Sequence, residues 1–270
     1  MLKRRLIPVL LLQNGLLVRS ELFKVHQIIG NPLHEVRRFN EWNIDELVYL
    51  DITRDGRYDL GRDDHRVRGL DHPLGILDAV AKTCFMPLTW GGRIQTLEDL
   101  HERFSRGADK VVLNSIAFRR PELIEEAACR FGSQAIVASI DAFRGPDGRT
   151  EVFVDGGRTP TGKAPGDWAH EVENRGAGEI LLQSIDRDGT GRGYDIELIG
   201  EVSSAVNVPV IACGGVGRFE DYAAGIEAGA SAVAAANIWH FKELADRKGK
   251  RALALAGIAV RPPRMEKSMQ

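Results

Sequence analysis

Eight short apolar runs, separated by segments with helical periodicity, constrain the fold of this chain more than any other feature. The runs read LIPVLLL, ELVYLDI, MPLTW, KVVLNS, AIVASID, EILLQS, VPVIAC and AVAAAN. Runs that are apolar throughout are typical of parallel strands buried on both faces. The segments between them place apolar residues at helical spacing, and several begin with a capping residue or proline. The clearest of these segments are 32–43, 96–106, 121–131, 195–205 and 219–228.

Eight strand–helix units in about 250 residues predict an α/β fold of the (β/α)8 TIM-barrel type. The alternative is a doubly wound open sheet, but no Gly-x-Gly-x-x-Gly sequence follows the first run. We expect residues 1–250 to form one barrel domain. Residues 251–270 are basic and proline-punctuated, and we expect them to form a partly disordered C-terminal tail.

The N-terminal stretch, MLKRRLIPVLLLQNGLLVRS, resembles a secretory signal peptide in beginning with positive charges followed by apolar residues. Pro8 interrupts the apolar run, the sequence QNG ends it, and no small-x-small cleavage site precedes Arg19. We therefore expect a buried first strand over residues 6–12, closed by a turn at Asn14-Gly15, rather than an export signal.

Composition excludes several classes of protein. The chain has 270 residues, of which 43% are hydrophobic and 27% charged, so it can bury a large core, and it contains no apolar span of membrane length. The formal net charge of -2 gives no bulk reason to expect nucleic acid. The cysteines, Cys84, Cys129 and Cys213, form no Cys-x-x-Cys pair, which fits a reducing cytoplasm. No metal or cofactor is expected, because the only metal-like patch, DDHRVRG, is better interpreted as a solvated loop.

The two halves of the chain resemble each other. DELVYLDITRDG aligns with GEILLQSIDRDG, MPLTWGGRIQTLEDL with VPVIACGGVGRFEDY, and GADKVVLNS with GASAVAAAN. This repetition predicts a barrel built from two fused half-barrels. The spacing between the first two motifs is longer in the first half, which places extra residues in the charged segment RDGRYDLGRDDHRVRGLDHP.

Polar residues follow the apolar runs directly, at the strand ends that form the reactive face of a (β/α)8 barrel. Two of these positions are glycine pairs, Gly91-Gly92 and Gly214-Gly215, at matching places in the two halves. Glycine pairs after a strand leave backbone N–H groups able to approach an anion. One pair alone would be interpreted as a turn, but the repetition predicts two phosphate sites and a substrate phosphorylated at both ends. The other polar residues at these ends are Asp51, Asn114, Ser115, Asp141, Asp186, Arg187, Asp188, Gly189, Thr190 and Asn237.

Four charged residues stand immediately before predicted strands, at the opposite end of the barrel. These residues are Arg5, Glu46, Lys110 and Glu179. Two positive and two negative charges there can form a ring across the bottom of the barrel. Judged on the residues alone, four solvated charges on an exposed rim are the favoured interpretation.

Several long motifs resemble one known family, the cyclase subunit of imidazole glycerol phosphate synthase (HisF). They are DELVYLDIT, GADKVVLNS, RFGSQAIVASIDA, GAGEILLQSIDRDGT, GYDIELI and FEDYAAGIEAGASA, and the similarity covers residues 3–241. The resemblance implies a (β/α)8 barrel that receives ammonia through its core from a HisH-like glutaminase docked on its bottom face. It implies that the ammonia reacts with a bis-phosphorylated substrate, giving imidazole glycerol phosphate and an aminoimidazole carboxamide ribotide.

The resemblance also assigns roles to individual residues. Arg5, Glu46, Lys110 and Glu179 fall on the family's ammonia gate, which reverses the interpretation as solvated charges, and Asp109 falls on the position facing the glutaminase. The family's phosphate-site positions fall on Asn114, Ser115, Asp188, Gly189, Gly215, Ala236 and Asn237.

The chain departs from the family at the first catalytic position. The family's first strand reads Ile-Pro-Cys-Leu-Asp, and its aspartate is one of two carboxylates that act as general base and acid during ring closure. The second carboxylate is kept as Asp141, whereas the first position is Leu11, which cannot transfer a proton. Arg93 replaces the third of three successive glycines in the family. The segment FKVHQIIGNP is more apolar than the family's loop after strand 1, and the charged insertion is also atypical.

The sequence IPVLLLQNGLLVRS followed by IIGNP is similar to a divergent branch of the family found with surface-polysaccharide genes. In that branch the barrel and its glutaminase supply ammonia to a third protein that amidates an N-acetyl sugar. Because the ammonia-handling residues are kept and a ring-closure residue is lost, ammonia delivery is our first hypothesis. The second is an authentic cyclase in which another carboxylate, such as Asp51, replaces the missing one. The third is a non-catalytic scaffold that activates a glutaminase.

Overall fold

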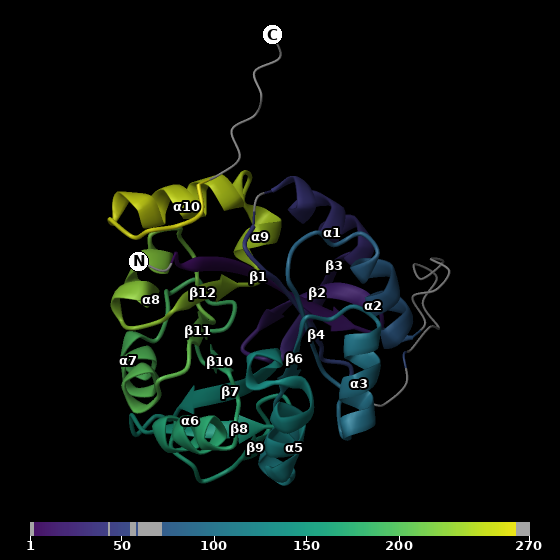
Figure 1. Cartoon of the computed structure of the whole chain (residues 1–270). Coiled ribbons are helices and arrows are strands. Elements are labelled where there is room, and N and C mark those ends of the chain that lie inside the picture. Colours follow the sequence, from purple (N-terminus) through teal and green to yellow (C-terminus); the bar gives the residue numbers. More distant parts are fainter. Residues whose placement is uncertain (1–2, 43, 55–57, 59–71, 263–270) are drawn as a thin grey trace.

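The computed structural model describes residues 3–42, 44–54, 58 and 72–262. Its centre is a closed barrel of eight parallel strands, which confirms the predicted (β/α)8 fold (Figure 1). In order around the barrel they are β1 (Arg5–Gln13), β4 (Leu47–Asp51), β5 (Leu88–Gly91), β6 (Lys110–Leu113), β7 (Ile136–Arg144), β10 (Glu179–Ser184), β11 (Val210–Cys213) and β12 (Ala232–Ala235). Each strand overlaps one of the eight apolar runs, and β12 pairs with β1 to close the circle.

Helices surround the barrel (Figure 1). They are α1 (Pro32–Glu41), α2 (Pro73–Ala81), α3 (Leu97–Ser105), α4 (Ser115–Arg119), α5 (Glu122–Phe131), α6 (Pro165–Asn174), α7 (Ile196–Ala205), α8 (Asp221–Glu227), α9 (Ile238–Phe241) and α10 (Ala245–Leu255), with a short 3-10 turn at Ser133–Ala135. The five predicted helical segments are α1, α3, α5, α7 and α8. Two of the predicted ranges begin at the capping residue itself, because the side chains of Thr96 and Asp195 accept hydrogen bonds from the first turns of α3 and α7. None of the described helices is long and apolar enough to span a membrane.

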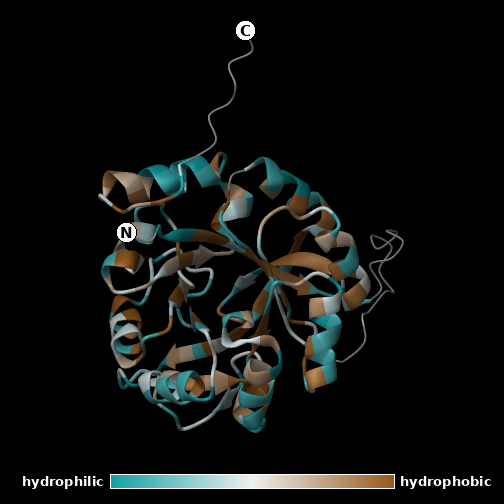
Figure 2. Ribbon diagram, viewed as in Figure 1, coloured by the Kyte–Doolittle hydropathy of each residue, from teal (hydrophilic) through white to brown (hydrophobic). Residues whose placement is uncertain are grey.

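The barrel strands separate two apolar clusters, because successive side chains point to opposite faces of a strand. On β1, Ile7, Val9 and Leu11 join the cluster that fills the barrel. Leu6 and Leu10 join the cluster between the strands and the helices. In Figure 2 much of the strand ribbon at the centre is brown, whereas the surrounding helices carry both teal and brown segments. The continuous apolar runs of the sequence therefore reflect burial on both faces.

Four strands outside the barrel were not predicted. The turn expected at Asn14-Gly15 is present, with φ of 51° and 77°, and it leads into the hairpin β2 (Leu16–Glu21) and β3 (Val25–Gly30). The segment after the first strand is therefore not a loop. β2 pairs antiparallel with the C-terminal end of β1 and with β3. Another extension, β8 (Thr150–Val154) and β9 (Thr159–Pro160), pairs antiparallel with β7.

The predicted C-terminal tail begins inside a helix, since α10 continues to Leu255. Beyond it, the carbonyl of Ala259 accepts a hydrogen bond from the backbone of Arg4 at 2.8 Å, and Arg261 lies 3.1 Å from a carboxylate oxygen of Asp45. The chain thus returns to the start of β1. Residues 263–270 and most of the charged insertion, including DDHRVRG, lie outside the described residues.

Candidate active site at the barrel mouth

A cavity of about 850 Å³ opens at the carboxyl ends of the barrel strands. All eight barrel strands, or the residues directly after them, contribute to its wall, together with the β2–β3 hairpin. The sequence-predicted residues that line it are Leu11, Asp51, Gly92, Arg93, Asn114, Ser115, Asp141, Asp188, Gly189, Gly214, Gly215, Ala236 and Asn237. Closure of the barrel therefore brings predicted positions from all eight strand ends into one cavity.

Four residues predicted at the mouth do not line this cavity: Asp186, Arg187, Gly91 and Thr190. The contacts of the last two explain their positions. Gly91 is inside the barrel, where an added Cβ would lie 2.6 Å from Leu50 and 2.8 Å from Val112, so its small size keeps the strands close together. The hydroxyl of Thr190 donates to the carbonyl of Arg187 at 2.7 Å and closes a turn. Both residues shape the mouth without facing its cavity.

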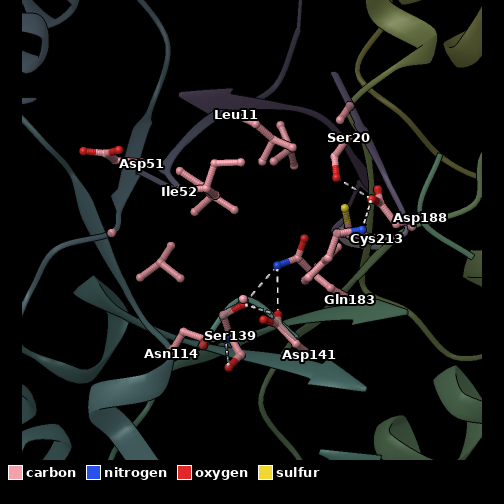
Figure 3. A pocket seen from close by; sticks show the side chains of 18 of the residues that line it. Leu11, Ser20, Asp51, Ile52, Asn114, Ser139, Asp141, Gln183, Asp188 and Cys213 are labelled. Atoms are coloured by element: carbon pink, nitrogen blue, oxygen red, sulfur yellow. Dashed lines mark hydrogen bonds between the residues drawn. The ribbon is translucent and has the colours of Figure 1, made fainter. Parts of the chain in front are cut away.

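Asp141 is the buried carboxyl group of the site. Its side chain extends from β7 beside Gln183 of β10 (Figure 3). The carboxylate accepts hydrogen bonds from the Gln183 amide at 3.1 Å and from the Ser139 hydroxyl at 3.4 Å. Burial raises the pKa of Asp141 to about 7, although these hydrogen bonds oppose the shift. A carboxyl group with this pKa can accept and return a proton near neutral pH.

Leu11 forms an apolar wall of the same cavity. Its side chain lies near Ile52 (Figure 3) and belongs to the apolar cluster that also contains Val9 and Leu50. Leu11 itself cannot transfer a proton, because its side chain is aliphatic. The mouth therefore has a polar wall at β7 and β10, whereas β1 contributes the apolar side chains of Val9 and Leu11.

Asp51, the candidate to replace the missing carboxylate, also lines the cavity, but its carboxylate is engaged by neighbouring groups. Strand alternation sends Leu50 into the barrel and Asp51 toward the outer side of β4. Its carboxylate accepts hydrogen bonds from the backbone of Thr53 at 3.0 Å and from the hydroxyl of Tyr58 at 3.1 Å. Burial raises the pKa of Asp51 above its usual value. Figure 3 shows it apart from Leu11, so the two positions are not equivalent.

The glycine pairs of the two halves have matching geometry. Gly92 and Gly215 have φ of 99° and 102°, and an added Cβ at either would lie 2.2 Å from a backbone carbonyl oxygen, that of Asp51 or Gly193. Only glycine fits these two corners. This correspondence agrees with two fused half-barrels, which stays a prediction from the sequence repeat.

Arg93, at the family's third glycine position, adopts a left-handed backbone with φ of 55°. Its carbonyl accepts a hydrogen bond from Arg103 at 2.9 Å, which holds the strained turn. Its guanidinium carbon lies 5.7 Å from the centre of the Tyr58 ring. The substitution therefore preserves the backbone shape that glycine would adopt and adds a positive charge to the cavity wall.

The β2–β3 hairpin contacts the cavity wall at Asp188, which follows β10. The Asp188 carboxylate accepts hydrogen bonds from the Ser20 hydroxyl at 2.7 Å and the Phe23 backbone at 3.2 Å, and its carbonyl accepts one from the Leu22 backbone at 3.0 Å. Burial raises the pKa of Asp188, with a further contribution from Glu21.

The sequence analysis did not identify Ser20, Phe23 or Gln183 as residues of the site. Gln183 was detectable, because it lies two residues after the inward-facing Leu181 on the same strand. The hairpin contacts had no local signal, since they join segments far apart in the chain.

The four charges at the other end of the barrel form a closed ring of ion pairs. Arg5 pairs with Glu46 at 2.5 Å and with Glu179, while Lys110 lies 3.1 Å from Glu46 and 2.7 Å from Glu179. Thr89 also donates to Glu46 at 2.8 Å. Glu46 and Glu179 are 2% and 4% exposed. The interpretation of these residues as solvated rim charges, made from the residues alone, is therefore wrong, because barrel closure brings four strand starts together.

Electrostatics within the ring favour ionised groups. Burial would raise the pKa of Glu46, but Lys110 and Arg5 outweigh it and hold that pKa below its usual value. Burial likewise opposes the charge of Arg5, yet Glu179 and Glu46 raise its pKa. Asp109 is exposed near this end, where its carboxylate accepts a hydrogen bond from the Leu88 backbone at 2.8 Å. Among the described residues, no group of three or more His, Cys, Asp or Glu side chains is arranged to hold a metal ion.

Comparisons with known proteins agree with this architecture. The family described as "Histidine biosynthesis protein" matches residues 5–245. The imidazole glycerol phosphate synthase subunit HisF of Gluconacetobacter diazotrophicus is 42% identical over 261 residues, covering 97% of both chains. The subunit of the same name from Alkaliphilus metalliredigens is 43% identical over 265 residues, covering 97% of this chain and 100% of the relative.

Proposed function

The chain belongs to the histidine biosynthesis protein family, and on that premise we propose that it is the barrel subunit of a glutamine-dependent synthase. A HisH-like glutaminase docks at the end of the barrel that carries the four-charge ring and Asp109. Ammonia released there crosses the barrel interior and reacts at the mouth with a phosphorylated small molecule. This places the nitrogen source and the acceptor at opposite ends of one barrel.

Asp141 is the observation that carries this proposal. When ammonia adds to an electrophilic carbon, the new nitrogen substituent must lose a proton. A buried carboxyl group with a pKa of about 7 can accept that proton near neutral pH. Gln183 and Ser139 fix its orientation, so Asp141 is positioned as a general acid or base for a substrate in the cavity.

The first candidate reaction is that of the named relatives, the cyclase step of imidazole glycerol phosphate synthase. Two relatives with this name align with the chain over nearly its whole length at more than 40% identity. Asp141 would be the retained carboxyl group of that reaction. This candidate requires the substrate or a bound water molecule to replace the proton transfer that Leu11 cannot perform.

The second candidate reaction is ammonia delivery for amidation of an N-acetyl sugar by a third protein, and Leu11 is the observation that favours it. Loss of one member of an acid–base pair typically lowers a rate by about 10²- to 10⁴-fold. Leu11 packs within the apolar cluster of the barrel interior, and the Asp51 carboxylate is engaged by the Thr53 backbone and the Tyr58 hydroxyl. Catalysis of imidazole ring closure is thereby weakened. The four-charge ring at the proposed ammonia entrance is complete.

One assay separates the candidates. The purified chain is given the bis-phosphorylated substrate of the histidine pathway and a high concentration of ammonium salt at alkaline pH, so that no glutaminase is required, and substrate consumption is followed by absorbance. Turnover by the wild type that is lost in Asp141→Asn supports the cyclase. Absence of turnover in the wild type, with turnover appearing in Leu11→Asp but not in the matched control Leu11→Asn, supports ammonia delivery. Absence of turnover in every variant excludes this substrate.

A further inference from the structure

Gln183 lies directly beside Asp141 in the barrel wall. The parallel register of β7 and β10 pairs these two residues, so their side chains extend to the same face of the sheet, and both line the cavity. Each residue stands within a barrel strand and not on a loop. The register of the two strands therefore holds the amide next to the carboxyl group.

The Gln183 amide makes two hydrogen bonds in this corner of the cavity (Figure 3). Its nitrogen donates to Asp141 Oδ1 at 3.1 Å and to the Ser139 hydroxyl at 3.3 Å, and that hydroxyl donates to the same Oδ1 at 3.4 Å. An ionised carboxylate only accepts hydrogen bonds, so the amide nitrogen, and not the amide oxygen, must face it. Both N–H groups of Gln183 are thus used to hold Asp141 and its neighbour.

The groups around Asp141 act on its proton in opposite directions. Burial favours the neutral carboxyl group, and the charge of Asp188, which follows β10, acts in the same direction, so both raise the pKa of Asp141. The neutral donors that favour the ionised form and lower this pKa are Asn114, Gln183 and Ser139. The pKa of about 7 is the balance of these opposing effects.

Cys213 of β11 also lines the cavity and interacts electrostatically with Asp141. Burial, with the charges of Asp188 and Asp141 adding to it, raises the pKa of Cys213 to about 12. The thiol is therefore neutral near pH 7 and adds no charge beside Asp141.

The balance matters because the other proton-transfer position of the cavity is apolar. Leu11 cannot transfer a proton, and the Asp51 carboxylate is engaged by its own neighbours. Asp141 is left both to accept a proton and to return it, which requires its ionised and protonated forms to be populated together at the working pH. Burial without the Gln183 donor would leave the carboxyl group mostly protonated near neutral pH.

We propose that Gln183 is a positioning residue for the reaction at the barrel mouth: its amide holds the Asp141 carboxylate in one orientation and stabilises the ionised form that accepts a proton from the substrate. Gln183 acts through Asp141 and not on the substrate itself. This inference rests on the proposed function, in which Asp141 is the general acid or base. It adds the residue that allows one buried carboxyl group to serve in both roles.

The pH titration of Asp141 tests the inference without any substrate. The side-chain carboxyl carbon of isotope-labelled full-length protein reports the protonation of Asp141, and its signal is assigned by its absence in Asp141→Asn. Gln183→Met keeps the length of the side chain and removes both donors, so the titration midpoint should rise by about one pH unit. Ser139→Ala is the matched control. It removes the longer hydrogen bond and should raise the midpoint by less than about half a unit.

The pH dependence of turnover separates this role from a merely structural one. Initial rates are measured with the bis-phosphorylated substrate of the histidine pathway at a fixed concentration of un-ionised ammonia, so that ionisation of ammonium does not enter the profile. The rate should rise with pH as Asp141 ionises, and the midpoint in Gln183→Met should move to higher pH by the same amount as the carboxyl titration. At pH 7 the variant should be roughly fivefold slower than the wild type, and the difference should shrink at higher pH.

The contrary results differ from one another. An unchanged carboxyl midpoint in Gln183→Met, an equal rise in Ser139→Ala, or a rate lowered equally at every pH would overturn the inference and leave the proposed function in place. A wild-type midpoint at about 4, the ordinary value for aspartate, would remove the inference and the acid–base role of Asp141 together. The expected carboxyl shift without turnover of this substrate would contradict the cyclase reaction and support the positioning role of Gln183.

Discussion

Both ends of the barrel hold buried carboxylates, but the pKa values of Glu46 at one end and of Asp141 at the other are shifted in opposite directions. At the ring, Glu46 and Glu179 each contact both Arg5 and Lys110. At the mouth, Asp141 receives hydrogen bonds from neutral groups. Burial acts on both ends, but cations outweigh it for Glu46, whose pKa is lowered, whereas it dominates for Asp141, whose pKa is raised to about 7.

This difference teaches that partner charge, and not burial alone, decides whether a carboxylate is structural or reactive. The ring pairs two cations with two carboxylates, and its cations hold the pKa of Glu46 below its usual value. The mouth holds a carboxyl group whose protonation changes near neutral pH, which is a property expected of an acid–base catalyst. Four predictions test the comparison.

Asp141→Asn should give the largest effect. The amide keeps the shape of the side chain but cannot accept the proton, so turnover of whichever acceptor proves active should fall by about 10²- to 10⁴-fold. Initial rates with saturating ammonium measure it. The ring variant Glu179→Gln is the control, since with ammonium supplied directly its rate should fall much less. Equal losses in both variants would mean that Asp141 has no special role.

Glu179→Gln should produce the largest loss of stability. It leaves Arg5 and Lys110 with a single carboxylate partner in a largely buried place, which should lower the free energy of unfolding by about 3 to 4 kcal/mol. Urea denaturation measures this loss. The matched control is Asp78→Asn, which breaks the half-exposed pair with Arg106 and should cost below about 1 kcal/mol. Similar costs for the two variants would contradict the special stability of the ring.

The pH dependence of stability should distinguish Asp141 from the ring carboxylate Glu46, whose pKa is lowered. The folded state raises the pKa of Asp141 from 3.8 to about 7, so between these values the native protein holds a proton that the unfolded chain has lost. Stability therefore falls as pH rises through this window, by roughly 3 kcal/mol relative to Asp141→Asn. Urea denaturation of both proteins from about pH 4 to pH 8 gives the difference. Parallel profiles would show that Asp141 titrates normally.

Thr89→Val should produce the smallest effect. It removes one neutral hydroxyl donor from Glu46 and leaves both cations in place. The free energy of unfolding should decrease by about 1 kcal/mol, the usual value for one hydrogen bond. A loss as large as that of Glu179→Gln would mean that the hydroxyl, and not the ion pairs, stabilises Glu46.

Much of the site could be predicted from the sequence because it follows from strand position. Residues directly after a barrel strand lie at its mouth, which located Asp141, Gly92 and Asn114 correctly in the cavity wall. Strand alternation also separates Leu50 from Asp51, although it was not used to exclude Asp51 as a replacement for the missing carboxylate.

The rest of the site depended on contacts between distant segments. Thr190 follows a strand as the prediction requires, but its hydroxyl closes a local turn. The hairpin was visible only as the turn Asn14-Gly15. Its attachment to Asp188 joins residues 168 positions apart, and no local pattern encodes such a pairing.

The sequence by itself determined the eight strands, the barrel they close into, and the chemical identity of Leu11 and Asp141 on its inner face. These properties are local, because backbone periodicity and side-chain type are written in neighbouring residues. Only the tertiary structure decided which charges meet. Arg5 reaches Glu46 across 41 positions and Glu179 across 174. Whether a charge is solvated, neutralised or left without a counter-ion depends on what closure of the barrel places beside it, and that determines both the ring and the reactive mouth.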